Sequence, residues 1–174
     1  MNVICFLIVF IFGLQVDWLE QTKELIVDVD NNLILVNTKL EEEKSGTITK
    51  KEFIADQIKK VELNIDYPGS INLEINYYDK EGFIFGEIIK GTTVLLYKRN
   101  RLEDEPYASI IESRTYFKNK NEGIKLTREL SLYEGDDIEN IQKKLQKMEF
   151  EKQLLVSDDY IDLKEKYDLN DDNK

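Results

Sequence analysis

Short runs in which hydrophobic and polar side chains alternate are the feature that most constrains the fold of this chain. In residues 71–77 (INLEINY) every second residue is apolar, and the residues between them are Asn or Glu. Successive side chains of a β-strand point to opposite faces, so this period of two predicts a strand with one buried face. The pattern recurs along most of the chain as far as residue 132, and it predicts a mainly β protein.

The predicted strands are separated by segments rich in Asn, Asp, Gly and Pro, which favour turns. Strands are expected at residues 24–29, 33–36, 47–55, 58–65, 71–77, 83–89, 92–98 and 124–132. Turns or loops are expected at residues 30–32, 40–46, 66–69, 79–82, 90–91 and 119–123. Residues 107–117 fit a helix in their first part and a strand in their last part, and both interpretations stay open.

After residue 135 the period of two gives way to a helical period. Apolar residues now follow at steps of three, four and three, which places them on one helical face: Ile138, Ile141, Leu145 and Met148. Asp136, followed by Glu139, has the spacing of a capping box that begins a helix. Leu154 and Leu155 are candidates for prolonging this helix, and the acidic end beyond them is expected to be a frayed helix or disordered.

Residues 3–16 (VICFLIVFIFGLQV) are almost entirely apolar. This run is shorter than the ~20 residues of a spanning helix and has the length of a signal-peptide core. No Lys or Arg precedes it, however, and no small-x-small cleavage site follows it. Three interpretations remain open: a short membrane anchor with Trp18 at the interface, a signal peptide, and a buried element of the fold. The large apolar side chains of the run would need cover on every face, which favours a membrane role. The expected parts of the chain are residues 1–19 as anchor or signal, 24–150 as a β-domain and 151–174 as an acidic tail.

The composition excludes several classes of function. The chain has no His, which removes a Ser-His-Asp or Cys-His nucleophile and a histidine metal site. Its single Cys excludes an intrachain disulfide and a cysteine zinc cluster. A net charge of −11 at pH 7 argues against nucleic-acid binding. We therefore expect no catalytic residues, no metal and no cofactor, and a protein that is not a conventional enzyme.

Three stretches together resemble the pleckstrin-homology-like (PH-like) fold, particularly the bacterial PH-like domains attached to short membrane segments. They are ELIVDVDNNLILVNT after the apolar run, FIADQIKKVELNI, and the terminal helix DDIENIQKKLQKM. The likeness is topological, and it implies a small barrel or bent sandwich capped by one amphipathic helix. The stretch 92–123 is longer than such a domain needs. A lipocalin-like barrel is the alternative, although that family's Gly-x-Trp signature is absent near the first strand.

The resemblance also implies a candidate site for an anionic headgroup, formed by Lys98, Arg99 and Arg101 with Lys59 and Lys60 possible neighbours. The competing interpretation, which we favour, is that the acidic residues 103–105 neutralise the first three. The sequence thus predicts a membrane-associated, non-enzymatic interaction or scaffold module with an unknown protein partner. The alternative is a secreted or surface-exposed barrel protein that binds a small apolar ligand.

Overall fold

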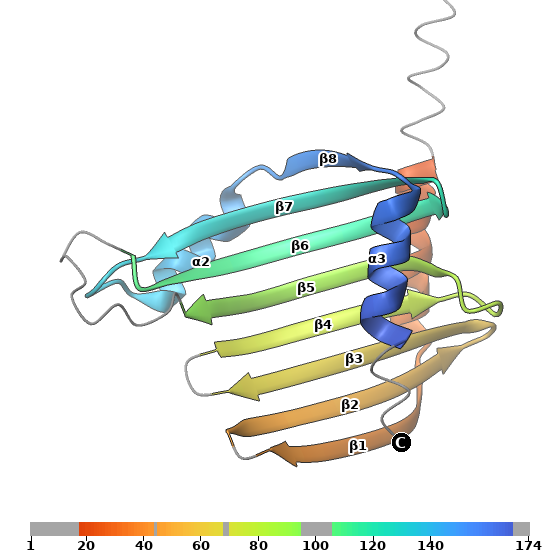
Figure 1. The fold of residues 1–174 in the computed structure, drawn as a ribbon, viewed down its shortest axis with the longest axis horizontal. Coiled ribbons are helices and arrows are strands. Elements are labelled where there is room, and N and C mark those ends of the chain that lie inside the picture. Colours follow the sequence, from red (N-terminus) through yellow and green to blue (C-terminus); the bar gives the residue numbers. More distant parts are fainter. Residues whose placement is uncertain (1–17, 44, 68–69, 95–105, 169–174) are drawn as a thin grey trace, which may run out of the picture.

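One antiparallel sheet of eight strands forms the centre of the protein (Figure 1). The computed structural model describes residues 18–43, 45–67, 70–94 and 106–168. Each strand pairs with the next one along the chain, so that β1 and β8 are the two edges of an open sheet. The strands are β1 (Ile34–Glu43), β2 (Gly46–Ala55), β3 (Ile58–Tyr67), β4 (Ser70–Tyr78), β5 (Ile84–Val94), β6 (Ala108–Asn119), β7 (Glu122–Leu132) and β8 (Glu151–Leu155).

Helices lie on both faces of this sheet. Figure 1 shows α3 (Ser157–Asp168) in front of the strands, with the helix at residues 18–31 and α2 (Ile138–Lys147) behind them. The neighbours Tyr77 and Tyr78 on β4 show how the faces divide, because successive strand residues point in opposite directions. Tyr77 packs with the helix at residues 18–31, and Tyr78 packs in the cluster of α3. We call these the two-helix face and the α3 face.

The main core lies between the two-helix face and the helix at residues 18–31. Ile26 and Val29 are one helical turn apart and both are buried against Tyr77, Phe85 and Tyr116 of the sheet. A second cluster joins α2 to the far end of the same face, with Ile141 and Leu145 packed on Ala108, Ile110 and Leu132. These apolar contacts provide most of the driving force for folding, since each fully buried large side chain contributes about 1.5–3 kcal/mol.

The prediction of a mainly β chain with a helix near its C-terminus is confirmed. The strands expected at residues 47–55, 58–65, 71–77 and 124–132 lie within β2, β3, β4 and β7, and residues 107–117 belong to strand rather than helix. The turn at residues 79–82 is also present, where Gly82 has a φ of 79°. That left-handed conformation costs little only for glycine, which explains the residue at this position.

The strand expected at residues 24–29 and its hairpin turn are wrong, because residues 18–31 form a helix. The alternation of Leu25, Val27 and Val29 suggested a strand. In the helix, however, Ile26 and Val29 point inward while Leu25 and Val27 are exposed. The helix continues until Asn32, whose backbone N–H donates to the carbonyl oxygen of Val29 at 3.0 Å. The segment is a helix because Ile26 and Val29 then bury the apolar side chains of the two-helix face.

Two of the expected loops are also wrong. Lys90 and Gly91 lie inside β5, where Gly91 is paired with Asn72 on one side and Ile111 on the other. Most of the loop expected at residues 40–46 is strand, because β1 continues to Glu43 and β2 begins at Gly46. Neighbouring strands satisfy the backbone groups of both segments, and this outweighs their local preference for turns.

Residues 136–168 also differ from the structure predicted for them from the sequence. Asp137 rather than Asp136 is the N-cap of α2, and its side chain accepts from the backbone N–H of Glu139. Leu154 and Leu155 belong to β8 and do not prolong the helix. Residues 157–168 form α3, which packs on the sheet through Tyr160 and Tyr167. The folded domain therefore extends well beyond residue 150.

A curled sheet was expected because one sheet cannot otherwise bury both faces. The described strands remain an open sheet, and helices on both faces, rather than one capping helix, do much of the covering. Residues 1–17, on which the anchor and signal interpretations depend, lie outside the described residues. Within the described part of the chain, no helix has the length and apolarity needed to cross a membrane.

Candidate functional site

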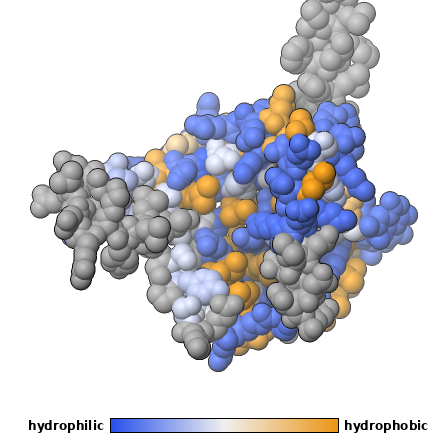
Figure 2. Space-filling view, viewed as in Figure 1, coloured by the Kyte–Doolittle hydropathy of each residue, from blue (hydrophilic) through white to orange (hydrophobic). Residues whose placement is uncertain are grey.

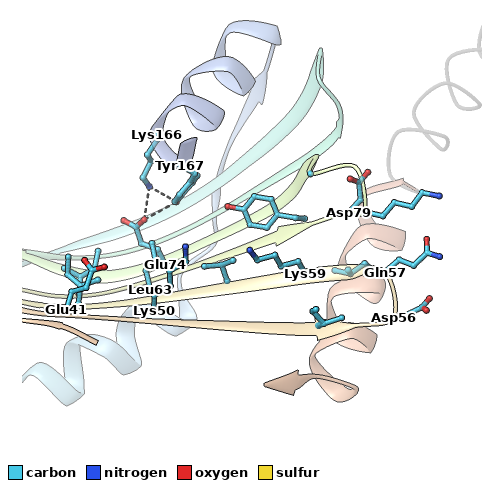
Figure 3. Close-up of a pocket in the computed structure, with 18 residues that line it drawn as sticks. Glu41, Lys50, Asp56, Gln57, Lys59, Leu63, Glu74, Asp79, Lys166 and Tyr167 are labelled. Atoms are coloured by element: carbon cyan, nitrogen blue, oxygen red, sulfur yellow. Dashed lines mark hydrogen bonds and ion pairs between the residues drawn. The ribbon is translucent and has the colours of Figure 1, made fainter. Parts of the chain in front are cut away.

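A groove on the α3 face is the site best suited to hold another molecule. It has a volume of about 730 Å³ and lies over β2, β3 and β4, with the last turn of α3 at one end (Figure 3). Aliphatic side chains of β2 and β3 line it: Ile48, Ile54, Val61, Leu63 and Ile65. Figure 2, which looks onto the α3 face, shows hydrophobic side chains exposed among charged ones. The helices thus leave part of this apolar surface open.

Strand register explains why these aliphatic residues meet. Ile48 on β2 is paired with Ile65 on β3, and Lys50 is paired with Leu63. Residues two apart in a strand share a face, so Val61, Leu63 and Ile65 form one continuous stripe. The stripe is the apolar half of the alternation in β3, and α3 covers it only in part: Leu63 packs against the cluster of Tyr160 and Tyr167, and Val61 is buried. We call this stripe with Ile48 and Ile54 the aliphatic floor.

Charged residues surround the aliphatic floor, and several of them form ion pairs. The Nζ of Lys59 lies 2.9 Å from the Glu52 carboxylate, and the Nζ of Lys50 lies 3.6 Å from it. The hydrogen bond from Lys59 holds the pKa of Glu52 below its ordinary value. Farther along, Lys39 pairs with Glu41 at 2.6 Å. This part of the rim is therefore close to electrically balanced.

The opposite end of the groove is a polar cluster formed by two elements far apart in the sequence. Lys166 at the end of α3 lies 3.1 Å from Glu74 on β4 and 3.3 Å from Glu87 on β5. The Tyr167 hydroxyl donates to Glu87 at 2.7 Å and lies 3.1 Å from Glu74 (Figure 3 draws Glu74 with both α3 residues). Thr115 on β6 donates to the second oxygen of Glu87 at 3.1 Å. We call Glu74, Glu87, Lys166 and Tyr167 the polar end of the groove.

Burial sets the protonation of this polar end. Burial raises the pKa of Tyr167 far above its ordinary value, and the neighbouring Glu87 raises it further. The phenol therefore keeps its proton at physiological pH and acts as a hydrogen-bond donor. Glu87 is only 5% exposed, so it depends on Tyr167, Thr115 and Lys166 to satisfy its oxygens.

Asn76 lies beside the polar end and is completely buried. It shares the α3 face with Glu74, two residues earlier on β4, and it is paired across the sheet with Glu87. By donor–acceptor geometry neither atom of its side-chain amide has a hydrogen-bond partner among the described residues, although the amide lies close enough to the Tyr167 hydroxyl to lower the pKa of that phenol. The Ser113 hydroxyl on β6 also has no partner there. Buried polar groups are normally paired, and an unpaired one costs about 1–3 kcal/mol, so this region has unused hydrogen-bonding capacity.

The structure describes two of the five residues of the predicted anionic headgroup site, and it places these two on opposite faces of the sheet. Lys59 lines the groove on the α3 face. Its neighbour Lys60 is buried on the two-helix face, 2.9 Å from both Asp30 and Glu62. Burial by itself lowers the pKa of Lys60, but the bonds with Asp30 and Glu62 outweigh it and the net shift is upward. Lys98, Arg99 and Arg101 lie outside the described residues, so the headgroup site stays a prediction.

A second hollow, of about 850 Å³, lies on the two-helix face beside α2. At its centre the buried carboxylate of Glu112 binds Arg114 at 2.7 Å on one oxygen and Arg128 on the other. Arg128 also donates to the carbonyl oxygens of Gln146 and Met148 at the end of α2. Both guanidinium groups lie over the Phe150 ring. These charges satisfy one another and hold α2 on the sheet, which indicates a structural role.

Sequence reasoning did not identify the polar end of the groove. Glu74 appeared as a solvent-facing residue of an alternating strand, and Lys166 and Tyr167 appeared in an acidic tail. The only available signal was the presence of two tyrosines, Tyr160 and Tyr167, seven residues apart in that tail, which is two helical turns.

No group of three or more potential metal ligands occurs within the part of the chain that the structure describes. Comparison of this chain with protein-family models, with curated proteins and with solved structures finds no match.

Proposed function

We propose that this protein is a non-enzymatic binding protein that holds a small amphipathic molecule in the groove of its α3 face. The observation that carries this proposal is the aliphatic floor, which the helices leave partly uncovered, with Ile54 43% exposed. Small-molecule sites are typically concave, largely apolar and about 300–1,000 Å³ in volume, with a few polar groups that fix orientation. The groove has a volume in this range and an aliphatic floor, with polar groups around its rim and at the end where α3 crosses the sheet.

Displacement of an environment-sensitive dye tests this proposal. A long-chain alcohol such as dodecanol, which has an apolar body and a neutral head, is expected to displace the dye saturably at micromolar concentration. The apolar contact explains the expected affinity, since each buried methylene contributes about 0.8 kcal/mol. Displacement that rises linearly without saturation, or no displacement, contradicts the proposal.

The substitution Leu63→Asn is expected to weaken dodecanol binding by at least about tenfold, because it puts an amide in the middle of the aliphatic floor. Dye displacement on the purified variant gives the change in Kd. Leu154→Asn is the matched control: Leu154 is 71% exposed on β8 and lies outside the groove, so binding should not change. Equal effects of the two substitutions would rule out the aliphatic floor as the binding surface. Circular dichroism melts establish that both variants are folded.

A second proposal is the membrane-associated interaction module that the PH-like resemblance implies. Its support is a row of exposed apolar side chains that follows closely after the apolar run at residues 3–16. The row comprises Leu25, Val27, Ile34, Leu35 and Val36. Exposed apolar patches of this kind are typical of interaction surfaces.

Fractionation distinguishes the membrane-associated module from a secreted binding protein. If the membrane proposal holds, the full-length chain stays in the pellet after a carbonate wash. Release into the wash, together with an intact mass that begins after about residue 13, supports secretion instead. The groove can operate in either location, so this experiment does not decide the binding proposal.

A further inference from the structure

The polar end of the groove is an anionic site that the protein fills with an ammonium group of its own. Glu74 and Glu87 contribute two carboxylates, Lys166 contributes one positive charge, and Tyr167 stays neutral. Two carboxylates therefore share the ammonium group of Lys166 beside the aliphatic floor. Charged groups with reduced access to water interact more strongly than exposed ones, which makes this end selective for positive charge.

The buried Asn76 amide is an independent sign that a polar group is missing at this place. Asn76 lies on the same face of β4 as Glu74, and its amide oxygen has no donor among the described residues. The Ser113 hydroxyl, on the same face of β6, is also unpaired there. The unpaired atoms of Asn76 and Ser113 include donors as well as acceptors, so the preference of this end for a hydrogen-bond donor rests on the carboxylates of Glu74 and Glu87, which accept only.

Lys166 is the member of the cluster that can leave most easily. Its side chain is 41% exposed and belongs to the last turn of α3, whereas the side chains of Glu87 and Glu74 are only 6% and 17% exposed. An ammonium group on a flexible, half-exposed stem can return to water at small cost. The two carboxylates are fixed on central strands of the sheet and cannot follow it.

We infer that the ligand of the groove is a long-chain alkylammonium compound, whose ammonium group binds Glu74 in place of Lys166 while its chain lies along the aliphatic floor. This inference rests on the proposed function and adds the chemical class of the ligand. Lys166 then acts as an internal competitor that occupies the polar end when the groove is empty. Three donors on an ammonium group match the three acceptors that Lys166 itself uses, which are Glu74, Glu87 and the Tyr167 hydroxyl.

Three probes with the same chain test the headgroup preference: dodecylammonium, dodecanol and dodecanoate, each below its aggregation concentration. Isothermal titration of the full-length protein is expected to give the tightest binding for dodecylammonium, at least about tenfold tighter than dodecanol, with dodecanoate the weakest. The isosteric variant Glu74→Gln should lose this preference, so that dodecylammonium binds no more tightly than dodecanol. Glu41→Gln, which removes a carboxylate from the other end of the groove, is the control and should keep the preference.

The variant Lys166→Met tests the role of the competitor. Removing the internal ammonium group should tighten dodecylammonium binding by about tenfold relative to dodecanol binding. If none of the three probes binds, the proposed function fails and this inference fails with it. If all three bind with similar affinity, or if Glu74→Gln keeps the preference, only the ammonium assignment is overturned. Weaker dodecylammonium binding by Lys166→Met would overturn the competitor role.

Discussion

Replacing Tyr77 with Ala is expected to lower the free energy of unfolding by about 3–5 kcal/mol, the usual cost of removing a large aromatic side chain from a core. Tyr77 is fully buried at the centre of the two-helix face. Its ring packs with Ile26 of the helix at residues 18–31 and lies 6.1 Å from the ring of Phe85. The substitution therefore leaves a cavity at the contact that holds this helix on the sheet. Urea denaturation followed by circular dichroism measures the change.

Two further substitutions separate the ring of Tyr77 from its hydroxyl. The hydroxyl donates to Asp30 at 3.1 Å, so Tyr77→Phe should cost only about 1 kcal/mol. Tyr133→Ala makes the same truncation at a residue that is 43% exposed, and it should change stability by no more than about 0.5 kcal/mol. A loss for Tyr77→Ala no larger than that for Tyr133→Ala would contradict the packing of the helix at residues 18–31 against β4.

The substitution Glu112→Ala is expected to lower the free energy of unfolding by about 3 kcal/mol at neutral pH. The loss arises because the substitution leaves two positive charges without their shared carboxylate. The side chain of Arg128 is only 9% exposed, so water cannot fully replace Glu112 as its partner. Glu122→Ala is the control, since Glu122 is 39% exposed and its pair with Lys118 is worth at most about 1 kcal/mol. A similar loss in both variants would show that the Glu112 cluster is not a buried ion pair.

Acidification should reduce the difference between wild type and Glu112→Ala. Burial favours the neutral acid, but Arg114 and Arg128 outweigh it and hold the pKa of Glu112 below its ordinary value of 4.5. A carboxylate with a lower pKa in the folded state contributes stability that is complete above its unfolded pKa and is lost as the pH falls through the folded value. Denaturation curves at pH 7 and at about pH 3 should therefore show a smaller destabilisation at the acidic pH. An unchanged difference would contradict this ionic role.

Where the spacing of apolar residues in a segment matched the face that the fold covers, the amino-acid sequence was sufficient to predict the local structure. The alternation in β4 and β7 and the helical spacing in α2 each reflect one face turned to the core, and the alternation in β3 reflects the apolar floor of the groove. Such a pattern depends only on residues close together in the chain. Lys59 and Lys60, predicted together as neighbours of the headgroup site, point to opposite faces of the sheet, as strand geometry requires.

Where two local patterns were compatible with the same residues, long-range packing made the choice. Residues 24–29 alternate as a strand would, yet they form a helix because Tyr77, Phe85 and Tyr116 provide an apolar face that Ile26 and Val29 can cover. The candidate site depends even more on distant contacts, since Tyr167 reaches Glu74 and Glu87 only when α3 folds back over the sheet. The sequence therefore specified the strands and the composition of the groove floor. The docking of helices created the polar end, because that site joins residues about ninety positions apart.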